Sequence, residues 1–209
     1  MTIRLCFFFI AILVLYLSRQ LDYSDDTATV IFHIFTMFVY FLCVLGAIIS
    51  DSWLGKFKTI LYLSLVYVCG SVLITLGAMP PLNLPATTFT MIGLALIALG
   101  SGGIKPCVSA FGGDQFKLPE QIKQMTTFFS LFYFSINSGS LISTTVTPIL
   151  REDVHCFGQK ECYSLAFGVP AVLMAVSISK YLYCIVLHCI NMRKPSCSYF
   201  HFGQTLVQK

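Results

Sequence analysis

Long apolar runs recur along this chain, and they constrain its fold more than any other feature. Each run has roughly 17 to 25 residues, which as an α-helix is long enough to cross about 30 Å of hydrocarbon. Polar or proline-rich turns separate one run from the next. We therefore predict an all-α membrane protein of about six transmembrane helices, with spans at about 5–21, 29–50, 58–79, 89–110, 127–149 and 164–189.

The composition supports a lipid environment for these helices. Of the 209 residues, 56% are hydrophobic and 11% are charged, and the mean hydropathy is +0.81. A soluble domain would expose more charge than this. The net charge of +4 does not indicate a nucleic-acid partner, because no basic cluster with interleaved aromatic residues occurs. We expect one bundle over residues 1–190, surrounded by membrane lipid, and a divergent cytoplasmic tail over 191–209.

The first span permits two interpretations. Arg4 followed by an apolar run is also how a signal peptide begins. No small-residue cleavage pattern precedes Arg19, so a retained, somewhat short helix is the favoured interpretation.

Basic residues in the turns predict the orientation of the bundle. Two sets of turns face opposite sides, with Lys56, Lys58, Lys117, Lys123, Arg193 and Lys194 on one side and Arg19, Arg151 and Lys160 on the other. By the positive-inside rule, the richer side and both termini are cytoplasmic. The loop with Cys156 and Cys162 is then extracellular, where oxidation is possible, and we expect a disulfide between these two cysteines.

Four stretches carry a resemblance to a known family. They are Gly46–Thr59 (GAIISDSWLGKFKT), Gly100–Phe116 (GSGGIKPCVSAFGGDQF), Phe128–Gly139 (FFSLFYFSINSG) and Cys162–Pro170 (CYSLAFGVP). They resemble the signatures of the proton-coupled oligopeptide transporter (POT/PTR) family of the major facilitator superfamily, particularly the animal intestinal and renal peptide transporters. The resemblance implies the amino-terminal bundle of a plasma-membrane symporter that moves di- and tripeptides with protons as the coupling ion and uses no cofactor.

The resemblance covers about residues 10–177. The glutamate-rich motif that opens helix one in the family is absent at residues 2–9, the sequence diverges beyond about Ser177, and the chain holds no second six-helix bundle. We therefore expect these 209 residues alone not to complete a transport cycle.

Two hypotheses about the function follow. In the first, the chain is a fragment, splice form or incomplete gene model of the symporter. In the second, it is a non-transporting form that pairs with a full-length transporter and modulates it. An enzymatic function is disfavoured. The sequence shows no nucleophile paired with a base, no cluster of metal-binding residues and no phosphate-binding loop at the spacing that these sites require.

Lys105 is the sharpest candidate residue. It lies in an apolar span between Gly103 and Pro106, where a charged amine costs several kcal/mol unless it is paired or hydrated, so it should face a cavity. The alternative without a function is a lysine near a helix end whose long side chain extends its amine to the membrane surface. The resemblance assigns Lys105 to the substrate carboxylate and to proton coupling. All nine acidic residues fall in expected loops, so no carboxylate is available inside the membrane.

Three further side chains are candidates. His33 and Tyr40 are seven residues apart, two helical turns, so both point to one face of a helix. The resemblance assigns His33 to proton handling, Tyr40 to a hydrogen bond with bound peptide, and Asn137 to the peptide backbone. The alternative for each is ordinary helix packing, which for Asn137 means a hydrogen bond at a small-residue seam.

The turn between the second and third spans carries Gly46, Asp51, Gly55 and Lys56. The glycines allow close backbone approach, and Asp51 can accept hydrogen bonds from helix ends and basic groups. With the resemblance we interpret this turn as a conformational gate, against the alternative of a plain tight turn. No metal site is expected.

Overall fold

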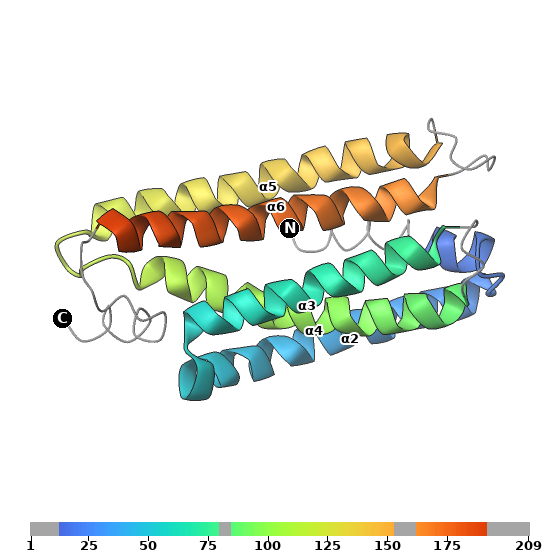
Figure 1. Cartoon of the computed structure of the whole chain (residues 1–209), viewed down its shortest axis with the longest axis horizontal. Coiled ribbons are helices and arrows are strands. Elements are labelled where there is room, and N and C mark those ends of the chain that lie inside the picture. Colours follow the sequence, from blue (N-terminus) through green and yellow to red (C-terminus); the bar gives the residue numbers. More distant parts are fainter. Residues whose placement is uncertain (1–12, 80–84, 153–161, 192–209) are drawn as a thin grey trace.

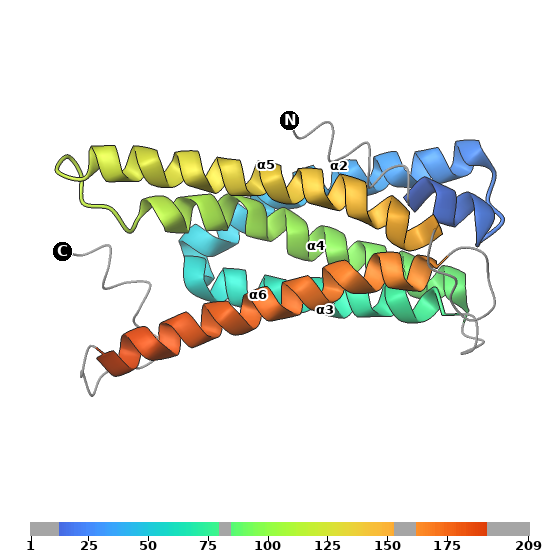
Figure 2. The ribbon, with the colours of Figure 1, turned by 90° about the horizontal axis from the view of Figure 1, so that it is seen from above.

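The computed structural model describes residues 13–79, 85–152 and 162–191, and these form an all-helical bundle (Figure 1). Helical residues 13–19 come first, followed by α2 (Asp25–Ile49), the π-helical turn η1 (Ser50–Leu54), α3 (Lys56–Gly77), α4 (Ala86–Gly113), α5 (Ile122–Glu152) and α6 (Tyr163–Asn191). The long helices run roughly along the longest axis of the molecule (Figures 1 and 2). The predicted all-α fold is confirmed.

Four described helical stretches are both long and apolar enough to cross a membrane: Asp25–Leu54, Lys56–Gly77, Ala86–Gly113 and Tyr163–Tyr183. The expected spans from 29–50 onward fall almost entirely within the described helices. Much of the expected first span lies outside the described residues. The limits of the embedded part of each helix, the extent of the bundle and the tail at 191–209 stay predictions.

The composition of α5 sets it apart from the other helices. With 31 residues it is long enough to span a membrane, yet its serines and threonines keep it out of the strongly apolar set. Several of these hydroxyls donate to a carbonyl four residues earlier, as Ser130 does to Thr126 (2.9 Å) and Ser135 does to Leu131 (2.8 Å). Because these hydroxyls are satisfied within the helix, α5 can still enter lipid or pack against other helices.

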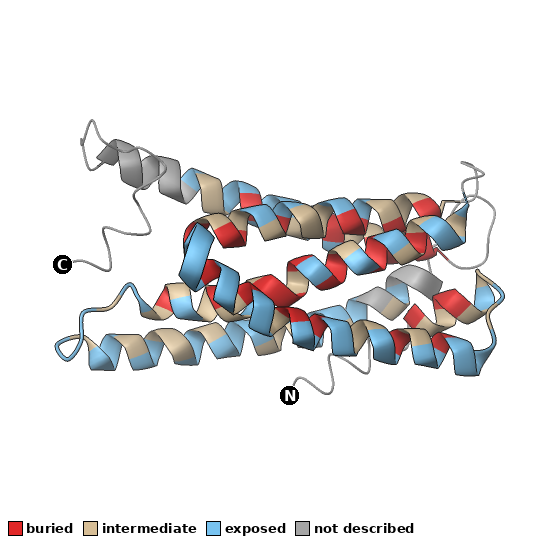
Figure 3. Ribbon diagram, turned by 90° about the horizontal axis from the view of Figure 1, so that it is seen from below, coloured by how far each residue is buried: buried red, intermediate tan, exposed pale blue. Residues whose placement is uncertain are grey.

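Helix α4 organises the bundle, because it packs along both α2 and α3. Helix α3 also packs against α6, whereas α5 meets α6 only near one end, and the two helices diverge along the rest of their length (Figure 2). Burial follows this arrangement: buried residues concentrate on α2, α3, α4 and α6, and none of the described residues of α5 is buried (Figure 3).

Glycines bring α4 close to its two neighbours. A Cβ at Gly46 of α2 would lie 2.4 Å from the Cα of Gly103, and a Cβ at Gly102 would lie 2.7 Å from the carbonyl oxygen of Val39. On the other side, a Cβ at Gly100 would lie 2.8 Å from the carbonyl oxygen of Leu63 in α3. Small residues at such contacts let helix backbones approach and are typical of membrane helix packing.

One end of the bundle is closed by an aromatic cluster around Tyr16. This side chain is fully buried, and its ring lies 5.3 Å from that of Tyr163 and 5.2 Å from that of Phe167 in α6, measured between ring centroids. The hydroxyls of Tyr16 and Thr90 of α4 are 3.3 Å apart and share a hydrogen bond. The cluster therefore ties the helical residues 13–19 to α4 and α6.

Candidate functional site

Two of the three residues expected to bind substrate lie together. Tyr40 comes from α2 and Lys105 from α4, and the Lys105 Nζ lies 5.9 Å from the centroid of the Tyr40 ring. Both side chains are exposed, Tyr40 to 49%. The distance is within the range of a cation–π interaction. The contact lies next to the close approach of α2 and α4 at Gly46, Gly102 and Gly103, which we call the α2–α4 seam. Gly102 and Gly103 precede Lys105 by less than one helical turn.

Lys105 has no carboxylate to balance its charge among the residues that the structure describes. The described acidic residues all lie at helix ends or in turns, namely Asp22, Asp25, Asp26, Asp51, Asp114, Glu120 and Glu152. None of them forms an ion pair with Lys105. An ammonium inside a membrane helix is stable only where water, an aromatic face or an anion compensates it. The geometry thus leaves this amine available to an anionic ligand.

His33 lies two helical turns before Tyr40 on the same face of α2. The sequence around it is apolar, and the side chain is exposed. Its ring contacts the neighbouring Phe32 ring edge-on at 5.7 Å between centroids. The imidazole makes no hydrogen bond to another described residue, so its nitrogens are accessible to water or a ligand.

Asn137, the third expected substrate residue, lies in the middle of α5. Its Oδ1 is buried and accepts no hydrogen bond, so no such bond joins it to Tyr40 or Lys105. A buried polar atom usually has a partner, and leaving it without one costs about 1–3 kcal/mol. The orphaned oxygen is an acceptor that a ligand, a water molecule or another helix can satisfy.

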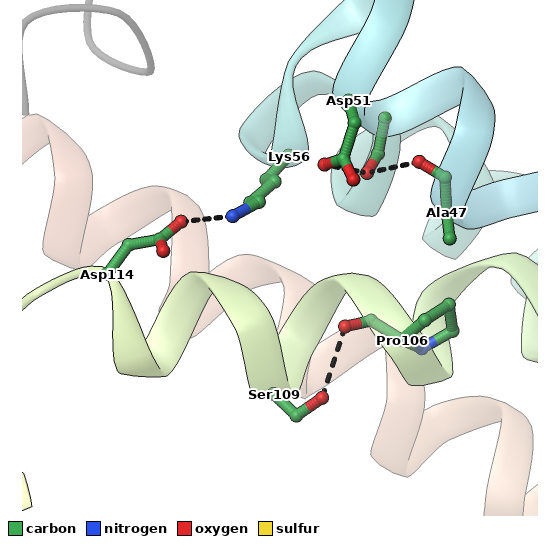
Figure 4. A network of polar contacts seen from close by, with 7 residues as sticks. Ala47, Asp51, Lys56, Pro106, Ser109 and Asp114 are labelled. Carbon is green, nitrogen blue, oxygen red and sulfur yellow. Dashed lines mark hydrogen bonds and ion pairs between the residues drawn. The ribbon is translucent and has the colours of Figure 1, made fainter. Parts of the chain in front are cut away.

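The expected gating turn is held by an ion pair that the sequence alone did not identify. Lys56, the first residue of α3, donates to Asp114, the residue that ends α4 (Figure 4). Asp51 instead accepts a hydrogen bond from the adjacent Ser50 hydroxyl at 3.3 Å. In the sequence, Asp114 belongs to the stretch Gly100–Phe116 that carries the family resemblance, but nothing there pairs it with Lys56.

The two glycines of the turn have different roles. Gly55 links η1 to α3 with φ 75° and ψ 148°, a conformation that favours glycine. Its carbonyl accepts hydrogen bonds from the Thr59 backbone N–H and hydroxyl. Gly46 lies within α2 rather than in the turn, where it packs against Gly103.

The cysteines separate into two groups. Cys162, just before α6, is disulfide-bonded, and its sulfur lies 3.6 Å from the Ser164 hydroxyl. The expected partner, Cys156, lies outside the described residues, so this pairing stays a prediction. Within the described ranges Cys43, Cys69 and Cys107 are free thiols, and no group of three or more metal-binding side chains occurs.

Several long apolar helices packed in one bundle define this chain as a multi-pass membrane protein. The sequence model of the POT family matches residues 57–196. The chain belongs to this family of peptide transporters. The match passes Ser177, so the resemblance extends further along α6 than the signature motifs indicated.

Two curated relatives give the same result. The chain is 64% identical over 167 residues to Peptide transporter family 1 of Drosophila melanogaster, and 57% identical over 170 residues to human Solute carrier family 15 member 2. Each alignment covers 80% of this chain but only 22% and 23% of the respective relative. The chain therefore spans less than a quarter of the length of these two proteins, which are transporters and not enzymes.

Solved structures share the fold. The crystal structure of the POT family transporter PepTSo has a TM-score of 0.68 and 37% identity, covering 84% of this chain and 34% of that one. A mutant peptide transporter POT in complex with alafosfalin has a TM-score of 0.70 and 26% identity, covering 86% of this chain and 35% of that one. The described helices thus correspond to part of a POT transporter.

Proposed function

We propose that this chain supplies amino-terminal helices of a proton-coupled symporter of di- and tripeptides in the plasma membrane, with both termini cytoplasmic. The observation that carries the proposal is Lys105. It extends an amine from a membrane helix beside Tyr40, with no described carboxylate to pair with it. A peptide's terminal carboxylate is a ligand of the required charge and size, and a charge-assisted hydrogen bond to it is strong in a low-dielectric site.

Other polar groups fit the rest of a short peptide. The Asn137 Oδ1 lacks a donor, and a peptide N–H can supply one. The Tyr40 hydroxyl can donate to a peptide carbonyl. Few, well-placed polar groups on an otherwise apolar surface are what orient small ligands.

His33 is our candidate for the proton-coupling group, together with Lys105. An imidazole is the side chain whose ordinary pKa lies closest to physiological pH, and no carboxylate occurs within the described spans away from their ends. His33 is exposed on the face of α2 that carries Tyr40. A proton taken up there would change the charge near the ligand site.

The Lys56–Asp114 pair is our candidate gate. Transporters of this superfamily expose a midplane site to one side of the membrane at a time by rocking rigid bundles. The pair joins the start of α3 to the end of α4 (Figure 4). It lies next to the Gly55 linker in the chain, whose conformation favours glycine. Separating these two helix ends would require breaking the pair, so the ion pair favours the closed arrangement of this end.

A reconstitution experiment tests the proposal. The chain is co-expressed with the remaining helices of the Drosophila relative, and pH-gradient-driven uptake of a labelled dipeptide is measured. We expect uptake by the pair, none by the 209 residues alone, and loss of uptake in Lys105→Ala. Lys123→Ala, an exposed lysine in the first turn of α5, is the matched control and should keep uptake. Full uptake by Lys105→Ala would remove Lys105 from the mechanism.

A second function is favoured by the uncovered apolar side chains of α2 and α5. Met37 is 76% exposed, and Phe134 and Leu141 are each 68% exposed. Such a surface can face lipid, and it can equally pack on another helix bundle, as a non-transporting form that pairs with a full-length transporter and modulates it would require. Co-purification of the 209 residues with a full-length relative, with altered uptake by that relative, would support this function. Independent migration in detergent would contradict it.

A further inference from the structure

We propose that Tyr40 positions the Lys105 ammonium through its aromatic ring rather than through its hydroxyl. The amine would then be held in place on α4 before any ligand arrives. The peptide carboxylate as the eventual ligand rests on the proposed function; the ring contact itself does not.

The contact geometry distinguishes the ring from the hydroxyl. The Lys105 Nζ lies 5.9 Å from the ring centroid, and Lys105 makes no hydrogen bond to the Tyr40 hydroxyl. An ammonium within about 6 Å of the centroid is attracted by the negative face of the ring. The contact with Lys105 therefore involves the aromatic face of Tyr40.

The surrounding backbone fixes the register of the two residues. Leu42, two residues after Tyr40, lies against Gly102, where an added Cβ would come within 2.8 Å of the Leu42 Cβ. Gly46 and Gly103 meet one turn further along α2. If α2 slid along α4, larger side chains would move into the close contacts at Gly102 and at Gly46 and would clash there. Tyr40 therefore stays beside Lys105 whenever these helices are packed.

If the Tyr40 ring orders the Lys105 side chain before a ligand binds, the affinity for that ligand should be higher. A lysine has a long flexible stem, and ordering that stem opposes ligand binding. A ring on one side of the ammonium reduces this loss while the remaining N–H donors stay available. From the typical strength of exposed cation–π contacts, removing the ring should weaken dipeptide binding about two- to five-fold. Tyr40→Phe keeps the ring and should show no such loss through Lys105.

The ring contact can be measured without a ligand. Lysines of the full 209-residue chain in lipid nanodiscs are reductively methylated with isotope-labelled formaldehyde, which preserves their charge. The Lys105 methyl resonance is assigned as the one that Lys105→Arg removes. Protons above an aromatic face are shifted upfield by the ring current, so we expect this resonance upfield of the exposed Lys117 and Lys123 signals.

Three variants decide between ring and hydroxyl. The upfield shift should persist in Tyr40→Phe and disappear in Tyr40→Leu. Tyr62→Leu, which removes an exposed tyrosine of α3, is the matched control and should leave the shift unchanged. An unshifted resonance in the natural sequence, or equal loss of the shift in Tyr40→Phe, would overturn the proposal. Helical circular dichroism confirms that each variant is folded.

A dipeptide titration, with the remaining helices of the Drosophila relative co-expressed, separates this inference from the proposed function. Movement of the Lys105 resonance on adding dipeptide, with weaker binding by Tyr40→Leu, supports both. A resonance that keeps its ring-current shift but does not respond to dipeptide counts against the carboxylate role of Lys105 and supports the ring contact on its own.

Discussion

At the scale of single residues, the backbone of Gly55 offers a test of the turn between η1 and α3. Its φ of 75° with ψ of 148° is open almost only to glycine, yet a Cβ there would meet nothing within 4 Å. The strain of Gly55→Ala is therefore purely conformational, and we expect a loss of about 1–3 kcal/mol in the free energy of unfolding in detergent.

Gly139→Ala is the control for that measurement. A Cβ at Gly139 also meets nothing within 4 Å, but this glycine lies inside α5 with ordinary helical dihedral angles. Alanine is the better helix former by about 1 kcal/mol, so this variant should be as stable as the natural chain or more stable. Equal stability of Gly55→Ala and Gly139→Ala would contradict the strained conformation of the turn.

Tyr181 of α6 allows a second residue-scale prediction. Its ring packs 5.6 Å from Phe57 and 6.4 Å from Phe111, while its hydroxyl is buried and makes no hydrogen bond. Tyr181→Phe keeps the packing and removes an unsatisfied group, so thermal unfolding should show unchanged or higher stability. Tyr181→Ala loses the packing and should cost about 2–4 kcal/mol. A large loss in Tyr181→Phe would mean that the hydroxyl has a partner.

Single residues also show what sequence reasoning can reach. Lys105 stood out because a charge in an apolar span is costly wherever the rest of the chain lies. Its neighbour across the helix pair could not be derived, because the contact with Tyr40 depends on the register of α2 against α4. The choice between an exposed and a packed His33 has the same origin, because local apolarity does not tell which face of α2 another helix covers.

At the scale of helices, the α2–α4 seam should be intolerant of even one methyl group. A Cβ at Gly46 would lie 2.4 Å from the Gly103 Cα and 3.0 Å from its carbonyl oxygen, and backbone atoms cannot rotate away. Gly46→Ala should therefore separate the helices, lower the free energy of unfolding by about 1–3 kcal/mol, and reduce the ring-current shift of Lys105.

Gly113→Ala provides the matched change in α4. A Cβ there would lie 3.5 Å from the Phe129 ring, an ordinary contact distance, so this variant should leave both readouts nearly unchanged. If Gly46→Ala behaved like Gly113→Ala, the seam would not set the position of Lys105.

The Lys56–Asp114 pair links two helix ends and should show a measurable coupling. Its side chains are 27% and 38% exposed, so a double-mutant cycle with Lys56→Gln and Asp114→Asn should give roughly 0.2–1 kcal/mol. Salt should reduce this coupling, because mobile ions screen exposed charges. The charge-exchanged double variant, Lys56→Asp with Asp114→Lys, should recover part of it. A coupling near zero at low salt would remove the pair as a gate element.

The helices themselves were largely predictable, and their pairings were not. Apolar run length sets where a membrane helix can form, so the spans fall within the described helices. Lys56 and Asp114 are 58 positions apart, and nothing in a single sequence joins them before the packing of α3 on α4 is known. The family match beyond Ser177 was missed because no signature motif marks that part of α6.

At the scale of the whole molecule, the main feature to explain is that some helices are packed against several others while α5 has few helix neighbours. Helix α4 is enclosed by α2 and α3, while α5 contacts chiefly α6 and has no buried residue among those described. Its hydroxyl-rich composition gives α5 too little apolarity to face lipid on all sides. A further protein surface over part of α5 agrees with relatives more than four times as long as the aligned region.

The covering of α5 can be tested by photocrosslinking. Phe134, 68% exposed on this helix, is replaced by the photoreactive analogue benzoylphenylalanine, and the chain is co-expressed with the tagged remaining helices of the Drosophila relative. Because α5 needs a protein neighbour, illumination should give a crosslinked product on a denaturing gel. The same analogue at Trp53, 88% exposed in the turn η1 at the helix ends, is the control and should give much less. Equal products from both positions, or a product only from Trp53, would place α5 against lipid and assign the interface to another helix.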